Sequence, residues 1–117
     1  MNSDYINSFI ESYLECALWS STDDDEDPLD DNYDVDNFSE SALNEMRKDC
    51  INFCKENAQH LTDIDPEQAG HDFWLTRNRH GAGFWDRGLG EVGVILTDAA
   101  HVYGSIDLVV SDNTIYC

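Results

Sequence analysis

Apolar residues recur at intervals of three and four over much of the N-terminal half, a spacing typical of helices that pack one face against a core. Residues 4–19 follow this pattern, with Glu11 and Glu15 on the opposite face, and residues 39–60 repeat it. The pattern breaks down between these two stretches. The sequence therefore predicts two amphipathic helices joined by a segment of different character.

Two further helices are predicted in the C-terminal half. Asp65 followed by Pro66 is a typical start signal, because an Asp side chain caps a helix and Pro fits its first turn. This helix is expected to run to about Asn78. The fourth covers residues 89–103 and is expected to end at Gly104, since glycine readily adopts the left-handed conformation that closes many helices.

The last residues have the alternation of a short β-hairpin. Residues 106–110 and 115–117 are rich in Ile, Val and Tyr, and a polar turn at 111–114 separates them. At 117 residues the chain has the size of one domain. We therefore predict a single mostly helical α+β domain over residues 1–117, with about four helices and a C-terminal hairpin.

The charge is strongly acidic and unevenly distributed. Twenty-five acidic and six basic residues give a formal charge of −19, of which −16 falls on residues 1–67 and −3 on residues 68–117. This balance argues against direct binding to nucleic acid or to an anionic membrane, because like charges repel. With 41% hydrophobic residues, no membrane-length apolar run and no signal-like N terminus, we expect a folded cytosolic protein.

Residues 23–36, called the acidic segment below, hold nine carboxylates and no Lys or Arg. Such a run repels itself, so it does not serve the stability of the fold. Two interpretations stay open: a solvated loop without a role, or a surface that offers negative charge to a partner that normally binds phosphates. Pro28, Leu29, Tyr33 and Val35 interrupt the run, and we expect them to pin it to the body of the protein.

A second cluster of polar residues lies in the predicted third helix and after it, and has the residue types of an active site. It consists of His71, Asp72, Arg77, Arg79, His80 and His101. Adjacent His and Asp side chains point in different directions on a helix, and no nucleophile or phosphate-loop motif is present. We therefore predict no catalytic residues and no enzyme. The arginines are expected to pair with carboxylates inside the fold, and the glycines to allow Phe84 and Trp85 to be buried.

The sequence lacks the spacing of known metal-binding motifs. A calcium loop starting at Asp23 would need Gly at its sixth position and Glu at its twelfth, where the chain has Pro28 and Asp34. The four cysteines lack the spacing of a zinc site and are expected to be reduced, mostly buried thiols. We predict no metal and no cofactor.

The basic residues of the second helix have a structural explanation. Arg47, Lys48 and Lys55 are expected to form ion pairs along the face of that helix.

The segment GHDFWLTRNRHGAGFWDRGLGEVG at residues 70–93, with TDAAHVYG at 97–104, resembles a family of small bacteriophage-encoded proteins. The match covers roughly residues 66–117 and leaves the acidic half outside it. Family members tend to be polar near Val94, where this chain is apolar. The resemblance implies phage origin and no particular chemistry.

Together these features favour a phage protein that mimics DNA and blocks a host DNA-binding enzyme by occupying its basic groove. Fourteen extended residues reach at most about 50 Å, which suits an enzyme that grips a few phosphates. The lead target is uracil-DNA glycosylase or a similar repair enzyme, because base-flipping enzymes grip short stretches of duplex. A restriction endonuclease or a CRISPR effector complex is the alternative target.

The predicted contacts combine acidic residues with a few apolar ones that would line a pocket against the first two helices. They are Glu11, Glu15, Asp23, Asp24, Asp25, Glu26, Asp27, Asp30, Asp31, Asp34, Asp36, Tyr33, Val35 and Phe38. The alternative from another class is a phage protein-interaction module that is no mimic. Its working surface would be the segment at residues 77–85, from Arg77 to Trp85.

Overall fold

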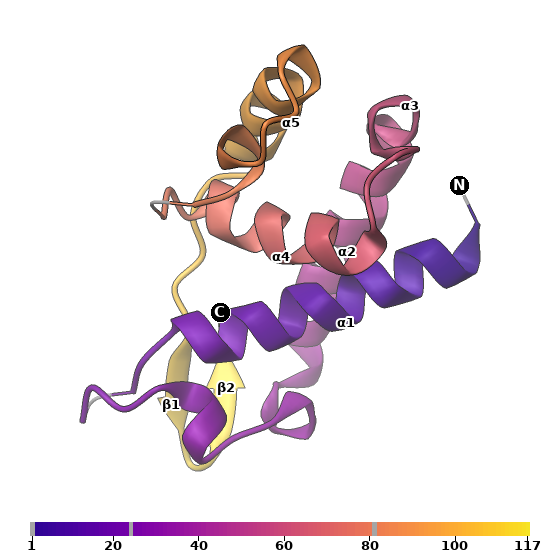
Figure 1. The fold of residues 1–117 in the computed structure, drawn as a ribbon. Coiled ribbons are helices and arrows are strands. Elements are labelled where there is room, and N and C mark those ends of the chain that lie inside the picture. The colour runs from indigo at the N-terminus through magenta and orange to yellow at the C-terminus, as the bar shows by residue number, and fades with distance from the viewer. Residues whose placement is uncertain (1, 24, 81) are drawn as a thin grey trace.

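The computed structural model describes residues 2–23, 25–80 and 82–117 of the chain. It confirms a mostly helical α+β fold with a C-terminal antiparallel hairpin (Figure 1). The helices are α1 (Ser3–Ser20), α2 (Glu40–Glu56), α3 (Ala58–Leu61), α4 (Pro66–Arg77) and α5 (Glu91–His101), and the strands are β1 (Val109–Ser111) and β2 (Thr114–Tyr116). Among the described residues, no helix is long and apolar enough to cross a membrane.

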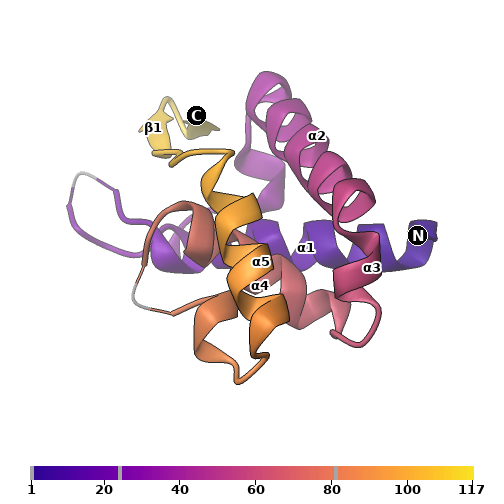
Figure 2. The ribbon, with the colours of Figure 1, turned by 90° about the horizontal axis from the view of Figure 1, so that it is seen from above.

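Helices α1 and α4 cross at close range and form the centre of the fold. A side chain at Gly70 would come within 2.9 Å of the backbone carbon of Phe9, so only glycine allows this approach. The Ser12 hydroxyl donates a hydrogen bond to the carbonyl of Glu67 across the same contact. Helix α5 lies over α4 on the side away from α1 (Figures 1 and 2). The hairpin, the acidic segment and the C-terminal end of α1 gather at one end of the molecule.

Aromatic rings from three helices and one turn make the core. Phe53 of α2 stacks on Phe73 of α4 with ring centroids 4.2 Å apart, and on Phe84 at 5.8 Å. Phe9 of α1 packs on Phe73 at 5.8 Å. All four side chains are fully buried. Phe84 is therefore buried as expected, whereas Trp85 is 55% exposed, and the expectation that it would be buried is wrong.

Two other details differ from the expectations. The helix predicted over 39–60 is interrupted at Asn57, whose side chain donates to the carbonyl of Phe53, and a short α3 follows. In the described part of the chain, Arg47, Lys48 and Lys55 form no ion pair within 4 Å. Exposed pairs of this kind gain little energy in water, so sequence spacing alone does not fix them.

The hairpin joins the end of the acidic segment to the rest of the fold. Its turn is narrower than predicted: Ser111 pairs with Thr114, and only Asp112 and Asn113 lie between the strands, with φ of 52° and 62°. Positive φ at both positions is typical of the turn that suits a two-residue hairpin. The hairpin also contacts the chain just after the acidic segment, because the backbone carbonyl of Ile115 in β2 accepts a hydrogen bond from the Ser39 N–H at 2.8 Å.

Candidate functional site

The acidic segment begins with a tight loop whose charged residues organise their own backbone. Thr22 pairs with Pro28 across the loop, and the Leu29 N–H donates to Ser21 at 2.9 Å. The Asp23 carboxylate accepts from the backbone N–H groups of Asp25 and Asp27, at 2.9 and 3.1 Å. Asp23 therefore shapes the loop in addition to carrying charge, in the manner of an Asx turn.

Three of the four residues predicted to pin the segment, Leu29, Tyr33 and Val35, fix its remainder to the body, whereas Pro28 is exposed and the prediction is wrong for it. Leu29 is fully buried in the core, and Tyr33 and Val35 pack against the core while staying partly exposed. Asp34 caps a short helical turn by accepting from the Asp36 N–H at 2.9 Å. The segment ends at Phe38, which is buried in the core. It is thus held at its start, its middle and its end.

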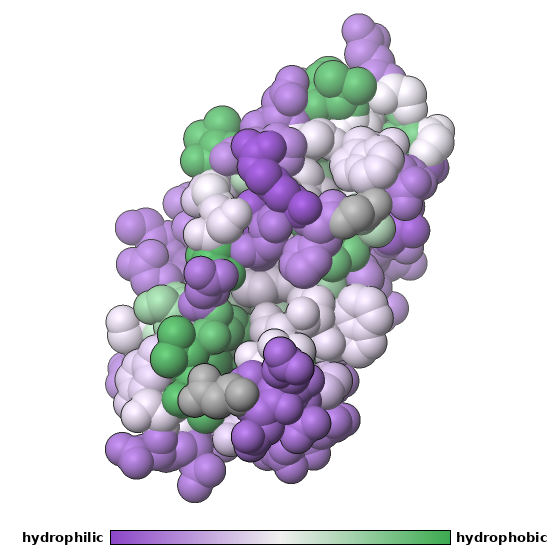
Figure 3. Space-filling model, turned by 90° about the vertical axis from the view of Figure 1, so that its left-hand side faces the viewer, coloured by the Kyte–Doolittle hydropathy of each residue, from purple (hydrophilic) through white to green (hydrophobic). Residues whose placement is uncertain are grey.

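The described carboxylates of the segment point mostly into solvent. Asp23 is partly buried; Asp25, Glu26, Asp27, Asp30, Asp31, Asp34 and Asp36 are exposed, and Asp24 lies outside the described residues. Within residues 2–23, 25–80 and 82–117 the ion pairs are Arg77 with Asp49 and Arg87 with Asp72. The described charges of the acidic segment are therefore without a basic partner, and hydrophilic groups gather at this end of the molecule beside a hydrophobic area (Figure 3).

Two grooves lie along α1 beside the acidic segment and contain several predicted contact residues. The first, called the Trp19 groove below, has a volume of about 600 Å³ and is lined by Glu15, Trp19, Tyr33 and His71 among others. The second, of about 710 Å³, lies between α1 and α2 and is lined by Glu11, Glu15 and Val35, among others. Phe38, in contrast, lies in the core. Trp19 and His71 were not among the predicted contact residues, although His71 belonged to the polar cluster considered for catalysis. A Trp at the end of an amphipathic helix and just before a charge run was a usable signal for Trp19.

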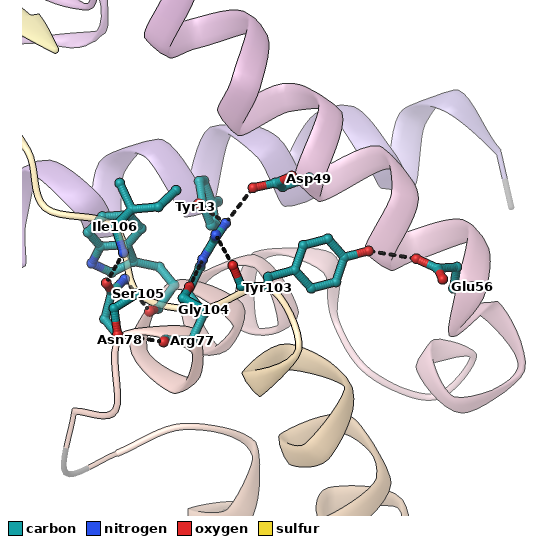
Figure 4. A network of polar contacts seen from close by, with 10 residues as sticks. Tyr13, Asp49, Glu56, Arg77, Asn78, Tyr103, Gly104, Ser105 and Ile106 are labelled. Atoms are coloured by element: carbon teal, nitrogen blue, oxygen red, sulfur yellow. Dashed lines mark hydrogen bonds and ion pairs between the residues drawn. The ribbon is translucent and has the colours of Figure 1, made fainter. Parts of the chain in front are cut away.

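Arg77 belongs to the interior of the protein (Figure 4). Only 2% of the residue is exposed. Its guanidinium donates to Asp49 at 2.8 Å, to the Tyr13 hydroxyl at 3.0 Å, and to the carbonyls of Tyr103 and Gly104 at 3.0 and 2.9 Å. One side chain thus joins α1, α2, α4 and the chain after α5.

Asp72 is likewise part of the fold. It is fully buried and accepts hydrogen bonds from Arg87 at 2.9 Å and from Gln68 at 3.0 Å. The hydrogen bonds to Asp72 raise the pKa of Arg87. The expectation that the arginines of the polar cluster pair with carboxylates inside the fold is confirmed for Arg77. It is wrong for Arg79, which lies in the turn after α4, is exposed and belongs to neither ion pair of the described residues. Arg87, which was not part of the cluster, pairs with Asp72. Among the described residues, no three His, Cys, Asp or Glu side chains come together as metal ligands.

The thiols yield a simple chemical prediction. Burial raises the pKa of Cys16 and of Cys54 to about 12, and that of the buried Cys50 well above its usual value. Thiolate is the reactive form, so these three should react slowly at pH 8. Partial burial also raises the pKa of Cys117, but this thiol is exposed to the reagent and should react first. A dithionitrobenzoate assay should count one fast thiol in the native protein and four in urea. Four fast thiols in the native protein would contradict this burial.

Comparison of the chain with protein-family models, curated proteins and solved structures gives no match. The resemblance of residues 66–117 to phage-encoded proteins therefore stays a prediction. Residues at the centre of that segment, such as Asp72, Phe73 and Arg77, are buried here. Their role in this chain is to hold the fold that carries the acidic segment.

Proposed function

We propose that this protein is a DNA mimic that binds the basic groove of a host DNA-binding enzyme and inhibits it. The observation that carries the proposal is the acidic segment, which is held to the body through Leu29 and Phe38. Its described carboxylates are unpaired with Lys or Arg, and all of them except the partly buried Asp23 are exposed. A duplex offers a groove-binding enzyme closely spaced phosphates on a stiff scaffold. Carboxylates held at fixed positions compete for the same Lys and Arg side chains.

The order of the segment matters for affinity as well as for recognition. A floppy acidic chain would lose conformational freedom on binding, and that loss weakens association. Here the pairing of Thr22 with Pro28 and the capped turn at Asp34 fix described parts of the backbone before a partner arrives. The overall charge of −19 adds long-range attraction to a basic groove. Association should therefore be fast at low salt and slower at high salt.

The lead target is uracil-DNA glycosylase, and the test is inhibition of uracil excision from a duplex oligonucleotide. Neutralising four exposed carboxylates, in the variant D25N/D27N/D30N/D31N, should weaken inhibition about tenfold. Exposed charge contacts contribute on the order of a few tenths of a kcal/mol each, and four of them together give about 1.4 kcal/mol. Asp23 and Asp34 stay in place because their side chains cap backbone turns.

The matched control removes the same charge elsewhere. The variant E45Q/D63N/D98N/D107N also neutralises four exposed acids, none of which belongs to the acidic segment. It should keep nearly full inhibition. Equal loss in both variants would mean that net charge alone acts, and no loss in either would contradict mimicry by the segment. Full uracil excision at saturating wild-type protein would reject this target, and a restriction endonuclease or a CRISPR effector would be assayed next.

A non-mimic interaction module is the second candidate, and the exposure of Trp85 favours it. In segment 77–85, Arg77 and Phe84 are buried, whereas Arg79, His80 and Trp85 face solvent. Under this alternative, W85A would abolish partner binding and the four-Asp variant would not. The two proposals therefore predict opposite results for the same pair of variants.

A further inference from the structure

Two aromatic rings from different helices form a wall of the Trp19 groove. The indole of Trp19, in the last turn of α1, lies beside the imidazole of His71 in α4, with ring centroids 5.8 Å apart and planes tilted by 38°. Trp19 is 59% exposed although a large apolar surface normally favours burial. Its ring is therefore available to a partner along an opening that the fold already provides.

Three carboxylates line the same opening. Glu15 comes from α1, and Asp30 and Asp34 come from the acidic segment. All three are exposed, and neither ion pair of the described chain involves any of them. The groove thus combines an accessible indole with unpaired carboxylates in about 600 Å³.

We propose that the Trp19 groove binds the guanidinium group of an arginine side chain from a protein partner. Tryptophan has the most favourable aromatic face for a cation, and arginine adds stacking to that attraction. The carboxylates can accept its N–H groups, in pairs where the geometry allows. The proposal rests on the proposed function, since enzymes that grip DNA present arginine to phosphates, and it names the side chain that the mimic would take up.

Charge and hydration favour arginine over other occupants. An apolar side chain would displace water from three carboxylates without offering them a hydrogen-bond donor, which is unfavourable. A lysine would satisfy charge, but its ammonium is more strongly hydrated and lacks the planar face that stacks on an indole. An arginine side chain can stack on the Trp19 indole and donate hydrogen bonds to the carboxylates of the groove.

The experiment compares fluorescently labelled deca-arginine and deca-lysine peptides of equal charge, binding to the full chain at about 150 mM salt. Wild type should bind deca-arginine more tightly, and W19A should weaken that binding about threefold to tenfold while changing deca-lysine binding much less. W85A is the matched control, because Trp85 is 55% exposed but lies outside the groove. W19F should retain part of the arginine preference, and W19L should not.

The result that would overturn the inference is equal binding of the two peptides, or an arginine preference that survives in W19A and W19L. Circular dichroism of each variant excludes unfolding as the cause of a loss. If D25N/D27N/D30N/D31N weakens both peptides while W19A changes neither, the groove proposal fails and charge mimicry stands. If W19A removes the arginine preference but no DNA-binding enzyme is inhibited, the groove proposal stands and the proposed function fails.

Discussion

Replacing Arg77 with methionine is expected to lower the free energy of unfolding by about 3–5 kcal/mol, the range typical of breaking a buried ion pair. Methionine fills similar space but offers no donor to Asp49, to the Tyr13 hydroxyl or to the carbonyls of Tyr103 and Gly104. Unmade hydrogen bonds in a buried site are costly because water does not replace them. A domain of this size is stable by only about 5–15 kcal/mol, so this loss is large.

Urea unfolding followed by far-UV circular dichroism measures this effect. R47M is the matched control, because Arg47 is exposed on α2 and belongs to neither ion pair of the described residues. It should change the unfolding free energy by less than about 0.5 kcal/mol. R77K should fall between the two, since lysine keeps the charge but cannot reach four acceptors at once. If R77M unfolded like R47M, Arg77 would not be the link between helices that its contacts indicate.

The parts of the fold predicted from sequence are those set by local chemistry. Asp65 and Pro66 specify where α4 begins, and the Asp65 side chain accepts from the Glu67 N–H at 2.9 Å, as an N-cap does. Gly104 has the expected left-handed conformation, with φ of 74°, although α5 ends at His101 and Gly104 closes the turn that follows it. These signals act within a few residues, so a single sequence contains all the information they need.

The parts that could not be predicted depend on contacts between distant residues. Arg77 was expected to pair with a carboxylate, but its partner Asp49 lies on α2, and no spacing along the chain identifies it. Trp85 looked like a core residue because it is large and apolar. The turn at Phe84–Asp86, however, buries the Phe84 ring and leaves the Trp85 ring exposed. The Trp19 groove is likewise a product of packing, since α1, α4 and the acidic segment each supply part of it.

Gly70 should tolerate no side chain. G70A is expected to destabilise the protein by about 2–4 kcal/mol, although alanine is the better helix former by about 1 kcal/mol. The added methyl would meet the backbone of Phe9, with the carbonyl carbon at 2.9 Å and Cα at 3.1 Å. Backbone atoms cannot rotate aside as a side-chain end can, so α1 and α4 would have to move apart.

The control for G70A is G93A in α5. There the added methyl would meet the Phe84 carbonyl oxygen at 3.0 Å and the Leu89 side chain at 3.3 Å, a tighter fit than usual but one that small shifts can relieve. The gain in helix propensity should offset most of this cost, so stability should change little. Similar urea midpoints for G70A and G93A would show that the α1–α4 crossing yields easily. A large loss in G70A alone would show that this close approach holds α1, and with it Glu11, Glu15 and Trp19, in a fixed position against the rest of the fold.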